Sequence, residues 1–265
     1  MDKIKNNHAI FSKGNSKNIP IVFIHGFPFD HNMWNHQTEK LSQEYFCVSY
    51  DIRGLGKSPA GEGQFTMEMF VDDLMEIIKG SKLNTPVICG LSIGGYIAQR
   101  AVEREEKNFR ALILCDTKSA GDNNDARIKR AEGIKKINEL GSKQYVKNFL
   151  PNCFSEESTR KLFYKETLNR SLKTSSVGLK GCLLAMAGRT DTTEFLSKIK
   201  IPVLIICGEK DKLSPPHIMK EMAESISNSE FHIIPRAGHI SPLENPETVN
   251  KIIADFLSPE VVSQA

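Results

Sequence analysis

Apolar residues along the chain fall into two repeating patterns. Short continuous runs rich in β-branched residues, typical of buried strands, occupy residues 19–24, 45–50, 86–90, 110–115, 201–207 and 230–234. Stretches with apolar residues at helical spacing lie between them, at 34–41, 66–79, the segment after residue 92, 215–226 and 247–257. Strands that alternate with helices predict an α/β fold, in which a mostly parallel sheet has helices on both faces.

This pattern changes at two places. Near the start, residues 8–12 are typical of a first edge strand followed by a polar turn. Between residues 118 and 195 the strand signals stop, and polar helices are expected at 125–140, 156–168 and 172–187. We therefore expect one domain with a core formed by residues 1–117 and 196–265, and a helical cap at 118–195 inserted after the sixth core strand.

The chain is organised around the sequence Gly90-Leu-Ser92-Ile-Gly94, where a predicted strand ends and a helix begins. A G-x-S-x-G sequence in this context predicts a nucleophile elbow, a strained turn that holds the serine Oγ above the sheet. The glycines are expected because strand and helix pass too close there for side chains. On its own, the same sequence is equally compatible with a plain glycine-serine connection.

Two further residues, on loops after strands, complete a candidate hydrolytic site. Asp211 follows strand 201–207 and His239 follows the last strand, so the chain order is Ser92, Asp211, His239. This is the order of nucleophile, acid and base in an α/β-hydrolase. A serine hydroxyl is a weak nucleophile until a neutral imidazole accepts its proton, and a buried carboxylate must orient that imidazole. We predict these three as the catalytic residues, with Asp116 as a rival for the acid.

Acyl transfer also needs hydrogen-bond donors for the oxyanion that forms at the carbonyl carbon. The backbone N–H groups of Phe27, in the turn after strand 19–24, and of Ile93 are the two candidates by position. His25 lies in the same turn as Phe27, where a structural hydrogen bond is its expected role. The remaining histidines are expected at the surface or in strands: His8, His31, His36, His217 and His232.

The loop that begins at Asp51 ends in Gly56-Lys57-Ser58, which is similar to the end of a phosphate-binding P-loop. That motif needs a glycine five positions before Gly56, where Asp51 stands, and no helix follows at once. Nucleotide binding is therefore rejected. Arg53 is expected to be structural and to tie Asp51 and nearby carbonyl groups together.

Composition narrows the range of functions. The net charge is only +3 and no long block of like charge occurs, which argues against nucleic acid or a membrane surface as a partner. The first residues lack the apolar run of a signal peptide, and no stretch is apolar enough to span a bilayer, so we expect a cytoplasmic protein. Disulfides, metals and other cofactors are not expected, because no C-x-x-C pair or metal-ligand spacing occurs. Four of the six cysteines fall in predicted strands: Cys47, Cys89, Cys115 and Cys207.

Five segments together resemble the α/β-hydrolase superfamily over nearly the whole chain. They are His25-Gly-Phe-Pro28, Asp51-x-Arg-Gly-x-Gly-x-Ser58, Gly90-Leu-Ser-Ile-Gly-Gly95, Gly208-Glu-x-Asp211 and Ala237-Gly-His239. More narrowly, segments 114–117, 185–189 and 239–246 are similar to the branch that contains 3-oxoadipate enol-lactonases and related esterases. The resemblance implies an α/β-hydrolase fold and a serine hydrolase that cleaves small carboxylic esters or lactones through an acyl-serine intermediate.

Residues at the elbow argue against neighbouring branches of the superfamily. Ser92 stands where haloalkane dehalogenases and epoxide hydrolases have an aspartate, and Leu91 where hydrolases of ring-cleavage products have an asparagine. Ile93 replaces a common methionine, which alters only the pocket wall. Two alternatives stay open: a cofactor-free haloperoxidase or perhydrolase that uses the same three catalytic residues, and a ligand-sensing protein with slow turnover.

Charge is divided unevenly between cap and core. Residues 118–190 hold fifteen Lys or Arg against seven Asp or Glu, a net charge of +8. Because the whole chain has a net charge of +3, the remaining residues have a net charge of −5. A positive cap above the elbow would concentrate anionic substrates. Exposed helices ordinarily carry such charges towards solvent, which is the simpler interpretation. Arg127 and Arg189, near the ends of the cap, are the candidates for substrate-pocket residues.

Overall fold

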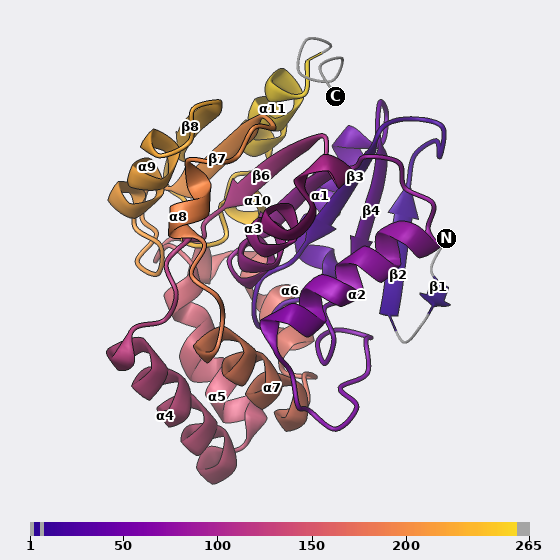
Figure 1. The fold of residues 1–265 in the computed structure, drawn as a ribbon. Coiled ribbons are helices and arrows are strands. Elements are labelled where there is room, and N and C mark those ends of the chain that lie inside the picture. Colours follow the sequence, from indigo (N-terminus) through magenta and orange to yellow (C-terminus); the bar gives the residue numbers. More distant parts are fainter. Residues whose placement is uncertain (1–2, 6–7, 259–265) are drawn as a thin grey trace.

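The computed structural model describes residues 3–5 and 8–258, which contain one eight-stranded sheet (Figure 1). The strands are β1 (Lys3–Lys5), β2 (His8–Lys13), β3 (Pro20–Ile24), β4 (Phe46–Tyr50), β5 (Val87–Leu91), β6 (Ala111–Cys115), β7 (Val203–Gly208) and β8 (Ser229–Ile234). Their order across the sheet is β1-β2-β4-β3-β5-β6-β7-β8. Neighbours from β4 to β8 are parallel, and β2 is antiparallel to both β1 and β4. The predicted α/β fold is confirmed.

One prediction about the edge of the sheet is wrong. The strand expected at residues 8–12 is β2, and β1 pairs with it on the outside, with Lys3 opposite Ile10. The sequence Lys-Ile-Lys of β1 is too short and too polar to be recognised from its pattern.

Helices cover both faces of the sheet (Figure 1). One face packs against η1 (His31–Trp34), α1 (Asn35–Leu41), α10 (Ser241–Glu244) and α11 (Pro246–Phe256). The other face packs against α2 (Met67–Gly80), α3 (Ile93–Glu105) and α9 (Pro216–Glu224). Side chains alternate along a strand, so successive residues of β3 pack on opposite faces of the sheet. Ile21 packs on the face covered by α1 and α11, and Val22 on the face covered by α2 and α3. Burial on both faces explains why the strands are continuous apolar runs.

The chain between β6 and β7 forms the cap, which lies at the end of the sheet where the parallel strands finish (Figure 1). It contains α4 (Asn124–Leu140), α5 (Ser142–Phe149), η3 (Leu150–Cys153), η4 (Ser158–Arg160), α6 (Leu162–Ser171) and α7 (Ser176–Ala187), and α8 (Thr193–Leu196) leads back towards β7. Phe27, which follows β3, makes edge-to-face contacts with Tyr145 and Phe149 of α5. The cap therefore packs directly on the loops that follow the strands.

Within the cap, one predicted helix needs correction and one helix was missed. The helix expected over residues 156–168 is interrupted, since η4 ends at Arg160 and Lys161 is extended before α6 begins. Just before this segment, the backbone N–H and hydroxyl of Ser155 both donate to the core residue Glu244. Helix α5 was not predicted, because its eight residues carry only three large apolar side chains.

All six cysteines are buried free thiols, and four of them lie in β4, β5, β6 and β7 as predicted. Within the ranges that the structure describes, no helix combines the length and the apolar character needed to cross a membrane.

Two glycines let the cap approach the core. A Cβ on Gly178, in the first turn of α7, would lie 1.8 Å from the carbonyl oxygen of Gly54 in the loop after β4. Gly54 itself has a φ of +81°, and its own Cβ would lie 2.9 Å from the Cα of Gly178. Backbone meets backbone at this point, so neither residue has room for a side chain.

We expect Gly178→Ala to lower the free energy of unfolding by about 1–3 kcal/mol, because overpacking forces the backbone to shift. Gly188→Ala is the matched control: it lies at the other end of α7, where the nearest atom to a new Cβ is 3.7 Å away. Urea unfolding followed by fluorescence of the single tryptophan, the fully buried Trp34, measures both variants. Equal stabilities for the two variants would contradict the tight contact.

Candidate active site

Ser92 lies in a strained turn between β5 and α3. Its φ of 54° and ψ of −116° fall outside the regions that residues with a side chain ordinarily adopt. A Cβ on Gly94 would lie 2.3 Å from the carbonyl oxygen of Ile24, and a Cβ on Gly90 would lie 2.3 Å from that of Gly94. Both glycines are required for this close passage, and the turn has the geometry of a nucleophile elbow.

The chain that includes and follows β6 holds this turn in place. The backbone N–H of Ser92 donates to the carbonyl oxygen of Cys115 at 3.1 Å. The hydroxyl of Thr117 donates to the carbonyl oxygen of Ser92 at 2.8 Å. A strained conformation persists only where its surroundings over-determine it, and these two hydrogen bonds contribute to that.

His239 and Asp211 meet on the loops after β8 and β7. Nδ1 of His239 lies 2.8 Å from Oδ2 of Asp211, and both residues are only 4% exposed. The other carboxylate oxygen of Asp211 accepts the backbone N–H groups of Leu213 at 2.8 Å and Ser214 at 3.0 Å. A carboxylate can only accept, so Nδ1 carries the proton and Nε2 is left as a proton acceptor.

The pKa of His239 reflects two opposing effects. Burial lowers it, because a buried imidazolium loses its hydration. The charge and hydrogen bond of Asp211 outweigh burial, and Asp116 adds to them, so that the pKa is raised above the ordinary value for histidine. The site therefore stabilises the imidazolium that a general base must form.

Asp116, the rival acid, has other partners. Its Oδ1 accepts the backbone N–H of Gly208 at 2.7 Å, and its Oδ2 accepts the N–H and the hydroxyl of Ser241 at 3.1 and 2.6 Å. Burial and the nearby charge of Asp211 raise the pKa of Asp116 to about 7. Among the described residues, no hydrogen bond joins Asp116 to His239, so the geometry favours Asp211 as the residue that orients the imidazole.

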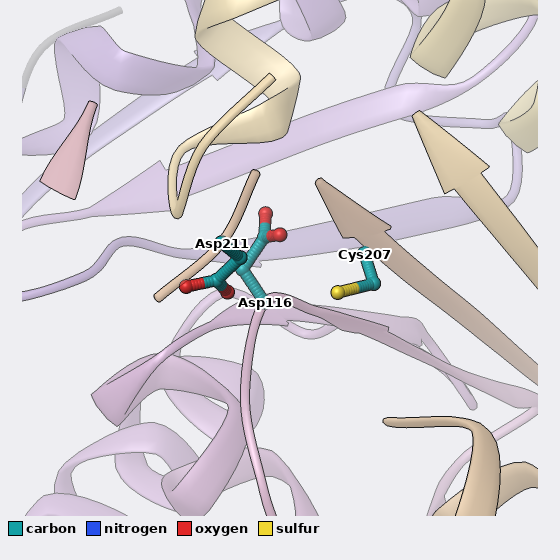
Figure 2. A group of neighbouring side chains, drawn as sticks. All are labelled: Asp116, Cys207 and Asp211. Carbon is teal, nitrogen blue, oxygen red and sulfur yellow. The ribbon is translucent and has the colours of Figure 1, made fainter. Parts of the chain in front are cut away.

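Asp116, Asp211 and Cys207 form a compact buried group with one ligand atom from each within 4.8 Å of the others (Figure 2). The carboxylate oxygens already accept hydrogen bonds from protein donors. Burial raises the pKa of the Cys207 thiol, which opposes the thiolate that a metal would need. The donor set therefore fits two carboxylates that already accept hydrogen bonds from separate protein groups, and we assign it no metal.

One of the two candidate oxyanion donors, Ile93, directly follows Ser92 in the elbow, and the other, Phe27, lies in the neighbouring turn after β3. Within the described residues, the backbone N–H of Phe27 donates to no other group. Ile93 is the first residue of α3, where the N–H has no partner inside the helix. The two segments are adjacent, since a Cβ on Gly26 would lie 3.5 Å from the Cβ of Ser92. The arrangement is suited to an oxyanion at the elbow.

His25 has the structural role that the sequence predicts. Its Nε2 accepts the backbone N–H of Ile52 at 2.9 Å, so its Nδ1 carries the proton and donates to the carbonyl oxygen of Gly26 at 2.9 Å. Complete burial lowers the pKa of His25. The neutral ring thus ties the turn that contains Phe27 to the loop after β4.

That loop departs from the prediction in two respects. Arg53 pairs with Asp73 of α2, with Nε 2.9 Å from Oδ2, and not with Asp51. Asp51 accepts the backbone N–H and the Nδ1–H of His31, at 2.7 and 2.8 Å, and the N–H of Lys57 at 2.8 Å. His31 is therefore a partly buried structural residue and not a surface one.

A cavity of about 720 Å³ lies between the elbow and the cap, with Ser92 and His239 both in its wall. This volume is typical of a site for a small molecule. Asp211 stands behind His239 and is not part of the wall. Core and cap both contribute apolar side chains to the wall, and the larger buried or half-buried ones include Phe27, Tyr96, Tyr145, Phe149, Leu183 and Met186.

The structure does not place Arg127 or Arg189 in the wall of this cavity. Arg189 is 5% exposed, and its guanidinium donates to Asp122 and lies 4.1 Å from the ring centroid of Tyr96. Nε of Arg127 donates to the carbonyl oxygen of Ala187. Both predicted pocket residues are structural because nearby acceptors capture their side chains.

A short part of the cap is tied to the loop that carries His239. The backbone N–H of His239 donates to the carbonyl oxygen of Cys153 at 2.9 Å. Glu244 accepts the N–H of Ser155 on one carboxylate oxygen and the N–H of Gly238 on the other, at 2.9 and 2.8 Å. The position of the imidazole therefore depends on segment 153–155 of the cap.

The sheet topology and the strained serine turn define the class of protein. A family model described as the alpha/beta hydrolase fold matches residues 19–246, and the chain belongs to this family.

Individual relatives resemble the chain over most of its length. The AB hydrolase superfamily protein YisY of Bacillus subtilis is 30% identical over 89% of this chain and 91% of that protein. The 3-oxoadipate enol-lactonase 1 of Acinetobacter baylyi is 28% identical over 89% of this chain and 88% of that protein. The structure of a thermophilic esterase from Thermogutta terrifontis, described as malate bound, has a TM-score of 0.90 and 32% identity, and covers 96% of this chain and 93% of that one.

We expect phenylmethylsulfonyl fluoride to modify one residue per chain, Ser92, because only an activated serine reacts readily with it. Asp211→Asn should slow the reaction at least about 100-fold, since the amide favours the wrong imidazole tautomer. Asp116→Asn is the matched control and should slow it far less. Mass spectrometry of peptides gives the site and the rate, and the reverse ranking would assign the acid to Asp116.

Proposed function

We propose that the protein is a serine hydrolase that cleaves small carboxylic esters or lactones through an acyl-serine intermediate. Ser92 is the nucleophile, His239 the general base, and Asp211 the acid that orients it. One observation carries the proposal: Ser92 in its strained turn and His239, held 2.8 Å from Asp211, line the same cavity of about 720 Å³.

The reaction takes place in two stages. The Ser92 hydroxyl attacks the substrate carbonyl while Nε2 of His239 accepts its proton, and the N–H groups of Phe27 and Ile93 donate to the oxyanion. His239 then returns the proton to the departing alcohol oxygen, which leaves an acyl group on Ser92. A water molecule, deprotonated by His239, releases the acid and restores the serine. In a lactone the departing alcohol stays on the same molecule as the acid.

The relatives support ester or lactone chemistry, because one is named an enol-lactonase and another an esterase. The cavity supports a small substrate, since it combines an apolar wall with the candidate nucleophile and base. Ser92, and not a carboxylate, at the elbow supports an acyl intermediate over the alkyl intermediate that an aspartate nucleophile forms.

We expect Ser92→Ala to lower kcat/KM for p-nitrophenyl esters at least about 1,000-fold, because the change removes the nucleophile and little else. Ser119→Ala removes a buried hydroxyl outside the cavity wall and should retain the rate. A folded Ser92→Ala protein with more than a few per cent of the original rate would contradict the mechanism.

The same assay separates the two alternatives that the sequence leaves open. Bromination of monochlorodimedone with peroxide and bromide, faster than ester hydrolysis, would identify a haloperoxidase. A ligand sensor would be identified if turnover were slower than about one per minute on every aryl ester tested while phenylmethylsulfonyl fluoride still modified Ser92.

The pH dependence tests the role of His239. The base must be neutral, so activity rises as pH increases through the pKa of His239, which is raised above the ordinary histidine value of about 6.5. We expect the midpoint of kcat/KM to lie above pH 6.5. It should fall in Asp116→Asn, because Asp116, with a pKa of about 7, is partly ionised in this range and its negative charge stabilises the imidazolium. A midpoint below 6.5, or no response to Asp116→Asn, would contradict this electrostatic account.

A further inference from the structure

Lys118 occupies a distinctive place beside the proposed nucleophile. It follows β6 by three residues, at the end of the sheet where the elbow lies, and it is in the wall of the cavity with Ser92 and His239. The sequence-based candidates for contact with an anion were Arg127 and Arg189, which the structure places elsewhere. Lys118 is thus a cationic residue that lies in the cavity wall near the elbow.

The ammonium group of Lys118 is half-buried and unpaired. In residues 3–5 and 8–258 its Nζ makes no hydrogen bond and no ion pair, and Asp122 and Asp211 act on it only from longer range. Burial, followed by the positive charge of Arg189, lowers the pKa of Lys118. A partly desolvated charge without a partner is unfavourable, and a bound anion would relieve that cost.

The other cationic residues of the wall differ from Lys118. Arg130 is already paired, with Nε 3.0 Å from a carboxylate oxygen of Asp122. The remaining three are exposed, so water screens their charge: Lys129, Lys136 and Lys212. Lys118 alone among them combines partial burial with a free ammonium group.

The acidic residues of the wall do not neutralise this charge. Asp122 accepts hydrogen bonds from both Arg130 and Arg189, so one carboxylate already serves two guanidinium groups. The other two acidic residues of the wall are exposed: Asp125 and Glu132. The buried side of the cavity therefore carries an excess of positive charge close to the elbow.

The backbone of Lys118 is fixed relative to the nucleophile. Its carbonyl oxygen accepts Nε2 of Gln99, in α3, at 3.2 Å. The preceding residue, Thr117, donates its hydroxyl to the carbonyl oxygen of Ser92 at 2.8 Å. A charge on a rigidly held segment can select a substrate group at a fixed position, which a charge on a mobile loop cannot do.

We propose that Lys118 binds a free carboxylate of the substrate, so that the preferred ester or lactone is an anion whose charge lies apart from the bond that is cleaved. This proposal rests on the proposed function, because it names the substrate class of the same site. The residue is a specificity determinant: it contacts the substrate and takes no part in proton transfer.

The kinetic test compares two esters of matched shape. One is the mono-p-nitrophenyl ester of adipic acid, and the other is its neutral counterpart in which an amide replaces the free carboxylate. We expect the wild type to prefer the anion, and Lys118→Met to lower the ratio of the two kcat/KM values at least about tenfold, mainly through KM. Lys118→Arg should retain most of the preference.

Lys143→Met is the control, because Lys143 is an exposed lysine of α5 outside the cavity wall. It removes the same charge from the cap and should leave the ratio within about twofold. A similar loss in both variants would show general attraction by the cap and would overturn a specific role for Lys118. Equal kcat/KM values for the two esters in the wild type would also overturn it, while ester hydrolysis itself would support the proposed function.

A binding experiment tests the proposal without catalytic turnover. Calorimetry measures the affinity of Ser92→Ala protein for monomethyl adipate, with and without Lys118→Met. We expect the second substitution to weaken binding at least about fivefold, because methionine removes the charge and breaks no contact made by Nζ. Unchanged affinity, or no binding to the Ser92→Ala protein, would overturn the anion site. Binding that depends on Lys118 in a protein that hydrolyses neither ester would support the site and contradict the proposed function.

Discussion

The close passage of α3 over the end of β3 is the constraint on which the rest of the site depends. Because a methyl group on Gly94 would lie 2.3 Å from the carbonyl oxygen of Ile24, helix and strand are almost in backbone contact. The turn that joins β5 to α3 has no room to relax, and Ser92 is held at a φ of 54°. The same approach sets the N–H of Ile93 beside the turn that carries Phe27. The positions of the proposed nucleophile and of the proposed oxyanion donors thus follow from one backbone contact.

The features that the sequence predicted well are those that local pattern determines. Parallel strands end at the same edge of a sheet, so residues that directly follow separate strands meet there without any knowledge of side-chain partners. Ser92, Asp211 and His239 were predicted in this way, and the structure brings His239 within 2.8 Å of Asp211 and into the same cavity wall as Ser92. Lys118 satisfies the same rule, since it follows β6, but it was counted only among the charges of the cap. Its position after a strand is visible in the sequence. Its role could not be inferred there, because it depends on which of the neighbouring cationic side chains pair with acidic residues.

The predictions that failed concern contacts between residues far apart in the chain. Arg53 reaches Asp73 in α2 instead of Asp51, and Arg189 reaches Asp122 instead of the cavity. The helix expected over 156–168 is interrupted at Lys161, and just before this range Glu244, 89 residues further along the chain, accepts the backbone N–H of Ser155. Long polar side chains and buried backbone groups go to whichever partner the fold supplies, and helical periodicity carries no information about that choice.

The hydrogen bonds between the cap and the loop of His239 divide the cap into two parts, and the sequence of one part is more constrained than that of the other. Segment 153–155 holds the loop of His239 in two ways: Cys153 accepts the backbone N–H of His239, and Glu244 links Ser155 to Gly238. This segment therefore supports the proposed active site although it lies within the insertion. Helices α4 and α7 make no such bonds to that loop, and they form part of the cavity wall. An exchange of caps between related hydrolases would therefore replace two separate parts, one on each side of segment 153–155, and the substrate range could change in those parts while His239 keeps its position.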